Sequence, residues 1–397
     1  MSKRERVPLP KGYWTIWSTV ALDLIGFGIV VPILGVYAER FGASGYEVGW
    51  LFATFALAQF VFSPLLGRLS DHIGRKPVIV ISLVGTAVGS FVTGAAGSLW
   101  VLFLGRAIDG SSGASLSVAQ AAVADMAPPE RRAGLVGMLG AAFGVGFVLG
   151  PAIGGLASLG GPHVPFYVAA VLASVNAIAA IIRLPETKVA SSAGHRSVRE
   201  RGPRLPALRR LAIIGFLGSL AFTAFEATFS LFGSSRFELT EGSAAVVFLG
   251  IGLVLVAVQG GGFGRLAGRV SAGRMYAGAL VVVTIGLAVV GVSTVWPLLI
   301  LGLLLLSVGQ GIASPALTEL VNQTAPAERR GAALGFQQSS YAIGRVLGPP
   351  LAGSAFDRVG VWSPMIAGAA LTALAWCLVL VWRTPRTAEV AASQGAM

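Results

Sequence analysis

Six ionisable residues fall inside long apolar stretches of this sequence, where a charge is costly to bury. They are four acids and two arginines: Asp23, Arg106, Asp109, Glu226, Glu319 and Arg345. In membrane helices such residues usually face a bundle interior or a water-filled cavity and mark ion, proton or substrate pathways. A carboxyl group holds its proton when it is desolvated and releases it when it is exposed or paired. These six residues are therefore candidates for proton coupling or for binding a substrate.

Asp23 is the strongest of these candidates. It lies about ten residues into the first apolar stretch, roughly 15 Å deep at the rise of an α-helix, close to the middle of a bilayer. Arg106 and Asp109 stand one helical turn apart, so a helix brings them onto one face, where they can pair. We favour a coupling or substrate role over a structural one for Asp23, and only slightly for Arg106.

Arg345 has no charged counterpart at the matching position of the first half of the chain, where Phe147 stands. Its expected role is to neutralise either Glu319 or Glu226, and a structural ion pair is the favoured interpretation. Glu319 falls near the end of its apolar stretch, so an interfacial position is as well supported as a functional one.

The elements that must position these residues are membrane helices. Hydrophobic residues make up 55% of the 397 residues and charged ones only 12%, and the mean hydropathy is +0.79. The apolar residues come in blocks of about twenty, the length that a helix needs to cross the hydrocarbon core. The pattern predicts an all-α integral membrane protein with twelve spans, near residues 13–37, 47–66, 77–97, 99–123, 134–158, 164–184, 211–233, 243–263, 275–295, 297–321, 332–356 and 361–382.

The basic residues follow the predicted topology. The net charge of +12 is spread over many short connections rather than gathered in one patch, which disfavours a nucleic-acid partner. Most of the 29 lysines and arginines lie on one side of the predicted spans, so the positive-inside rule puts both termini in the cytoplasm and the protein in the cell membrane. The single cysteine, Cys377, excludes a disulfide framework, and we expect no metal and no cofactor.

An internal repeat divides the chain. Pro128 with the Glu-Arg-Arg of residues 130–132 recurs as Pro326 with the Glu-Arg-Arg of residues 328–330, an offset of 326 − 128 = 198 residues. Both copies precede the fifth span of a half. The repeat predicts two pseudo-symmetric six-helix bundles, over 1–185 and 211–397, joined by a cytoplasmic linker over 186–210.

A glycine-rich loop follows the second predicted span. It carries Gly67, Asp71, Gly74 and Arg75 in the string GRLSDHIGRKP. The glycines permit a tight turn, and Asp71 can accept from an arginine or from a helix N-terminus. A loop that only orients the chain would explain the basic residues, but it would not explain the spacing of the glycines and the acid. We therefore predict a gating loop.

A second string lies in the fifth predicted span. Gly146, Gly150, Pro151, Gly154 and Gly155 fit the pattern G-x-x-x-G-P-x-x-G-G. Glycines four apart make a flat helix face for close packing, and the proline bends the helix. We expect Gly150 and Gly154 to face a neighbouring helix of the other half and so to help close the outer side.

These strings resemble those of the major facilitator superfamily, and within it the twelve-span drug:proton antiporters and tetracycline exporters. Asp23 with the string DLIGFGIVVP and Arg106 with GRAIDG are similar to the matching helices of the same group. The resemblance implies alternating access by two bundles about a central cavity, with proton entry coupled to export of small lipophilic or cationic drugs. It also implies that Asp71 docks against the segment 330–333. We expect the protein to be a monomer.

The sequence departs from the tetracycline exporters at two places. Leu255 stands where those exporters have a histidine, and the ninth span, 276–295, has no acid. A drug range broader than tetracycline is therefore expected. An exporter or facilitator of a metabolite such as a sugar is the alternative. A membrane enzyme is disfavoured because His72, His163 and His195 are scattered over different loops.

Overall fold

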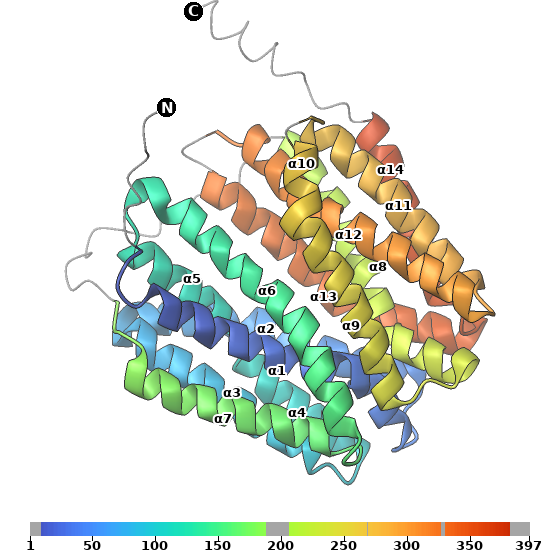
Figure 1. The fold of residues 1–397 in the computed structure, drawn as a ribbon, viewed down its shortest axis with the longest axis horizontal. Helices are drawn as coiled ribbons and strands as arrows, with labels where there is room; N and C mark the ends of the chain where they lie inside the picture. The colour runs from blue at the N-terminus through green and yellow to red at the C-terminus, as the bar shows by residue number, and fades with distance from the viewer. Residues whose placement is uncertain (1–8, 188–205, 268, 327–329, 382–397) are drawn as a thin grey trace, which may run out of the picture. The chain divides into compact units, whose positions relative to one another are not determined.

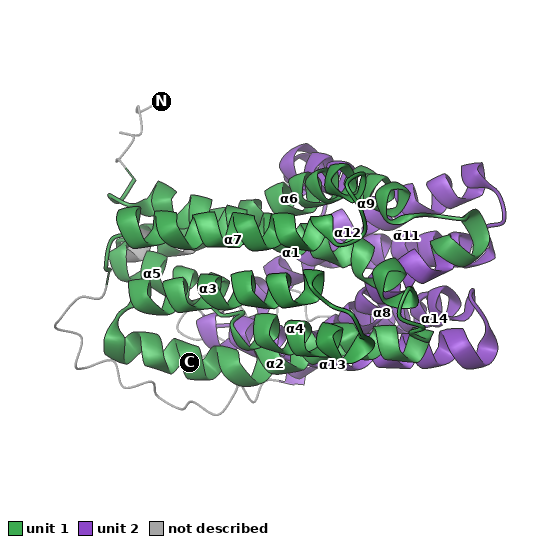
Figure 2. Cartoon of the chain, turned by 90° about the horizontal axis from the view of Figure 1, so that it is seen from below, with its two compact units in different colours: residues 1–197, 233–252 green, residues 198–232, 253–397 purple. Residues whose placement is uncertain are grey.

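The computed structural model describes residues 9–187, 206–267, 269–326 and 330–381. All the regular structure in these segments is helical (Figure 1). Residue contacts divide the chain into two compact units, which Figure 2 colours separately. Most of the predicted linker over 186–210 lies outside the described residues.

Unit 1 comprises residues 1–197 and 233–252. It contains the first seven helices: α1 (Tyr13–Glu39), α2 (Gly45–Ile73), α3 (Arg75–Gly94), α4 (Leu99–Ser111), α5 (Ser115–Met126), α6 (Pro129–Ser158) and α7 (Val164–Arg183). Its apolar core is built from α1, α3, α5, α6 and α7 and includes the buried residues Tyr13, Ile16 and Leu139.

Unit 2 comprises residues 198–232 and 253–397. The remaining elements are α8 (Pro206–Phe237), α9 (Glu241–Ala257), the π-helical turn η1 (Val258–Gly262), α10 (Phe263–Ala267), α11 (Ala272–Val292), α12 (Trp296–Thr324), α13 (Arg330–Val359) and α14 (Ser363–Val381). The unit boundaries cut α8 and α9, so the C-terminal end of α8 and most of α9 belong to unit 1. The predicted bundles, 1–185 and 211–397, follow chain order instead and remain a prediction.

Every predicted span coincides with helical structure, which confirms the all-α membrane fold. In the described residues, ten helices are long and apolar enough to cross a membrane by themselves. The eighth span runs as one segment, Glu241–Ala267, through the π-helical turn. The fourth is broken into α4 and α5, and α13 carries Gln337, Gln338 and Arg345. These two spans therefore fall short on length or on hydropathy.

Candidate functional site

The fourth span is interrupted inside unit 1. Helix α4 ends at Ser111 and α5 begins at Ser115. The amide of Gln59 on α2 donates to the freed carbonyl oxygen of Gly113 at 2.9 Å. Gly110 lies so close to α2 that a Cβ atom there would overlap the backbone of Phe55. Helix α2 thus packs on the interruption and supplies the hydrogen bond that the carbonyl group of Gly113 would otherwise make with solvent.

Arg106 and Asp109 form a buried ion pair on α4. Nη1 of Arg106 lies 3.0 Å from Oδ2 of Asp109, and only 3% and 12% of the two side chains are exposed. The guanidinium carbon also lies 4.2 Å from the centre of the Phe55 ring, a cation–π distance. Helix α3 packs closely on Asp109, because a Cβ atom on Gly89 would lie 2.7 Å from the Cβ atom of Asp109. The pairing predicted from the spacing is present.

Asp23 joins this cluster from α1. Its Oδ2 accepts a hydrogen bond from the hydroxyl of Ser115, the first residue of α5. Its carboxylate also interacts electrostatically with Asp109. The structure therefore brings three of the predicted residues together within one unit. Sequence reasoning missed Ser115, whose signal was the run of small residues from Gly110 to Ser115.

The other three ionisable candidates lie in unit 2. Glu226 on α8 and Arg345 on α13 interact electrostatically, which selects Glu226 from the two partners expected for Arg345. Glu319 is exposed on α12 and accepts from Gln323 one turn further on, at 2.9 Å. Glu319 and Arg345 thus have different polar neighbours.

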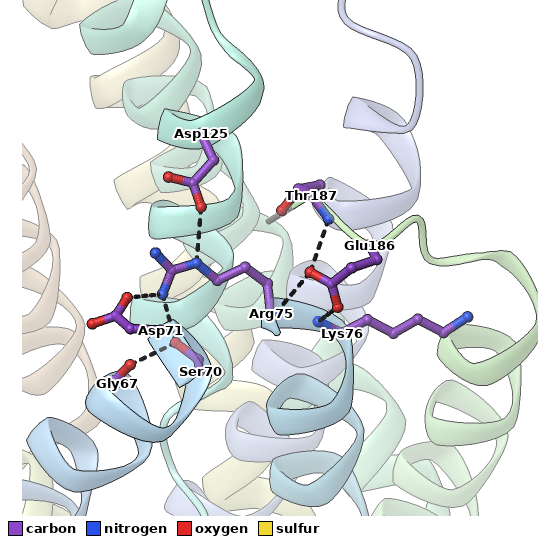
Figure 3. A network of polar contacts seen from close by, with 8 residues as sticks. All are labelled: Gly67, Ser70, Asp71, Arg75, Lys76, Asp125, Glu186 and Thr187. Carbon is purple, nitrogen blue, oxygen red and sulfur yellow. Dashed lines mark hydrogen bonds and ion pairs between the residues drawn. The ribbon is translucent and has the colours of Figure 1, made fainter. Parts of the chain in front are cut away.

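The predicted gating loop is mostly helical, because residues 67–73 form the last turns of α2 and only Gly74 separates α2 from α3. The expectation that Gly67 permits a tight turn is therefore wrong. The side chains of this segment form a polar network (Figure 3). Nη1 of Arg75 lies 2.6 Å from Oδ1 of Asp71, and its Nε lies 2.9 Å from Oδ2 of Asp125 at the end of α5. The Ser70 hydroxyl accepts from Arg75 and donates to the carbonyl oxygen of Gly67. Arg75 therefore ties the end of α2 to the end of α5. The docking of Asp71 on 330–333, which the resemblance implies, stays a prediction.

Glu186 caps the N-terminus of α3. Its Oε1 and Oε2 accept from the backbone N–H groups of Arg75 at 2.9 Å and Lys76 at 3.2 Å (Figure 3). An anion is stabilised at a helix start, where N–H groups lack helical partners. Gly74 has φ +107° and ψ 160°, a conformation that is essentially restricted to glycine. This explains why the turn needs its glycine.

Gly74→Ala is expected to destabilise the protein by about 1–3 kcal/mol, the usual cost of such backbone strain. An added Cβ atom would also overlap the carboxylate of Glu186 and disturb the cap. The melting temperature of the purified protein in detergent measures the effect. Gly137→Ala on α6, where nothing lies within 4 Å of the added Cβ, is the matched control. Equal melting temperatures in the two variants would contradict this account.

The glycines of α6 face two different helices. A Cβ atom on Gly146 would press on Leu24, one on Gly150 would overlap Gly28, and one on Gly154 would contact Ile29, so these three pack on α1. The expectation that Gly150 and Gly154 face the other half is therefore wrong. Gly154 precedes Gly155 by one position, about 100° around the helix, and Gly155 is the glycine of this string that meets α9.

One contact between α6 and α9 lies at the carbonyl group that Pro151 leaves without a helical partner. A proline has no N–H, so the carbonyl group of Phe147, four residues earlier, loses its helical partner. Gly252 of α9 packs directly on this carbonyl group, and a Cβ atom at Gly252 would overlap it. At the start of α9, Oε1 of Glu241 lies 2.7 Å from Nε of Arg40, the residue after α1. These contacts explain why 233–252 belongs to unit 1.

Comparisons with known proteins extend over nearly the whole chain. Residues 16–270 and 262–396 match the sequence model of the Major Facilitator Superfamily. The tetracycline resistance protein, class D, of Salmonella ordonez is 32% identical over 390 residues, 94% of this chain and 96% of that protein. The quinolone resistance protein NorA of Staphylococcus aureus is 27% identical over 386 residues, 95% of this chain and 97% of that protein. Among solved structures, the human organic anion transporter MFSD10 (TETRAN) is 27% identical with a TM-score of 0.69, covering 93% of this chain and 98% of that one.

Proposed function

The chain belongs to the Major Facilitator Superfamily, and we propose that it exports small lipophilic or cationic drugs in exchange for protons. The family resemblance that the sequence motifs indicated is confirmed, and the chain is a multi-pass membrane transporter rather than an enzyme. The observation that carries the proposal is full-length similarity to resistance proteins for two unrelated drug classes, tetracyclines and quinolones.

The proposed substrate range is broader than tetracycline. The side chain of Leu255 packs against Gly311 of α12, so an apolar contact occupies the position of the exporters' histidine. Helix α11 carries no acidic residue. A binding site that lacks this histidine and this acid suits a range of apolar and positively charged drugs better than it suits one metal-chelating drug such as tetracycline.

Asp23 is the proposed site of the exchanged proton. It lies deep in α1, accepts from Ser115 and interacts with Asp109, whose charge is matched by Arg106. Three charged groups in one polar cluster leave a net negative charge, which one proton neutralises. We place the protein in the cell membrane as a monomer with both termini in the cytoplasm.

Transport by purified protein in liposomes tests the proposal. Liposomes are loaded with ethidium, a lipophilic cation, or with a quinolone, and a pH gradient is imposed across the membrane. We expect uphill drug movement together with proton movement in the opposite direction, and neither in protein-free liposomes. A rate and extent of drug movement that do not depend on the pH gradient would exclude proton exchange. Uptake of a sugar without drug movement would favour the metabolite alternative.

A further inference from the structure

The first turn of α5 points into the cluster that contains Asp23. Ser115 is the first residue of α5, is only 4% exposed, and donates its hydroxyl hydrogen to Asp23 across the interface with α1. The first N–H groups of a helix have no helical partners, and the helix end carries a partial positive charge. Both features favour the ionised form of a carboxyl group that lies beside them.

We infer that the interruption of the fourth span is a device that weakens proton binding by Asp23, with Ser115 as its positioning residue. The inference rests on the proposed role of Asp23 as the proton site. An uninterrupted helix would have no free N–H groups at this depth, because each would bond to the carbonyl group four residues earlier. The interruption places the Ser115 hydroxyl group and the N-terminus of α5 beside the carboxylate of Asp23.

The interruption is built into the surrounding helices. Gln59 of α2 satisfies the Gly113 carbonyl group, and a Cβ atom on Gly113 would approach the Gln59 amide nitrogen to 2.7 Å. The hydroxyl groups of Ser63 on α2 and Ser117 on α5 lie 3.2 Å apart just beyond it. Helix α2 therefore fixes the position of α5, and α5 in turn fixes Ser115.

The charged groups that act on Asp23 come from α4. Asp109 disfavours a second negative charge nearby, and Arg106 compensates Asp109 through its ion pair. Four helices in the described residues pack on α1, and their charged residues lie toward the helix ends. Helix α6 has none beyond Arg132, α7 none before Arg183, α5 none before Asp125, and α2 none between Glu47 and Arg68. Ser115 is thus the polar neighbour whose removal changes hydrogen bonding to Asp23 and leaves every charge in place.

An infrared titration of the purified protein in detergent tests this inference. The protonated carboxyl C=O band that is missing from Asp23→Asn reports the protonation of Asp23 alone. In Ser115→Ala the carboxylate loses a hydrogen bond, so the protonated form persists to higher pH. We expect the midpoint to rise by about one pH unit, a tenfold change in proton affinity.

Two variants serve as controls. Ser115→Thr keeps the hydroxyl donor and should restore the wild-type midpoint. Ser117→Ala makes the same change two positions away, on an exposed residue that does not contact Asp23, and should leave the midpoint unchanged. If Ser115→Ala does not insert, Ser115→Cys, with a weak donor of similar size, should shift the midpoint in the same direction.

An unshifted midpoint in Ser115→Ala overturns the inference, and so does an equal shift in Ser117→Ala. Neither result contradicts the proposed function, because Asp23 would still bind and release a proton in both cases. Wild-type proton-driven efflux by Asp23→Asn would instead remove Asp23 from the proposed function. The two failures are therefore distinguishable.

Discussion

Asp23→Asn is expected to abolish proton-driven drug efflux completely. Asparagine has nearly the same shape as aspartate, and its carbonyl oxygen can still accept from Ser115, so the packing of α1 on α5 is retained. It cannot bind and release a proton in the physiological range. The rate of drug transport across the liposome membrane under an imposed pH gradient should fall to that of protein-free liposomes.

Two measurements separate coupling from structural damage. Downhill drug movement without a pH gradient should persist in Asp23→Asn, because alternating access itself needs no proton. Asp23→Glu restores the carboxyl group and should recover part of the gradient-driven efflux. Loss of downhill movement as well, in a variant that melts at a lower temperature, would show that Asp23 is structural.

Gly252→Leu is expected to push α9 away from α6 near the middle of the two spans and so to widen their spacing at the end predicted to face outside. The added side chain would overlap the backbone carbonyl group of Phe147, which cannot move aside as a side chain can. Overpacking of this kind costs about 1–3 kcal/mol, which shifts a two-state equilibrium roughly 5- to 150-fold. The fraction of molecules in which α6 and α9 are in contact should therefore decrease, and drug efflux should slow.

Spin-label distances measure this separation. Labels on Leu159 and Val246, which are 83% and 64% exposed, report the spacing of the end of α6 and α9. The distance should lengthen in Gly252→Leu. Gly250→Leu is the matched control, because it lies on the same helix and nothing is within 4 Å of an added Cβ there. Identical distance distributions in the two variants would disprove the role of Gly252.

The spans and the ion pair on α4 could be predicted because they depend on local patterns. A block of about twenty apolar residues has few other uses, and a spacing of three residues puts Arg106 beside Asp109 on any helix. The helix partners of the α6 glycines could not be predicted in this way. The spacing of Gly146, Gly150 and Gly154 shows that one face is flat, but the same pattern fits any neighbouring helix, and here that neighbour is α1.

Contacts between residues far apart in the sequence could not be predicted either. Glu186 follows Arg75 by 111 residues, and no periodicity connects a carboxylate after α7 with the first turn of α3. Nothing in the local sequence pairs the first turn of α3 with an acid from another part of the chain. The break after Ser111 was hidden for a different reason. Residues 99–123 read as one apolar block, and hydropathy averages over the small polar residues that interrupt it.

The short length of α4 has a consequence for how the protein is made. With 13 residues α4 rises only about 20 Å, less than the roughly 30 Å of hydrocarbon, and it carries Arg106. Helix α5 completes the fourth span, but the charge of Arg106 in its first half makes release of this span into lipid on its own unfavourable. Helix α3 is synthesised just before α4 and fits it closely, since Gly89 packs on the backbone of Gly105 and on Asp109. We therefore expect α3 and α4 to leave the translocon as a pair, with the charge already sheltered between them.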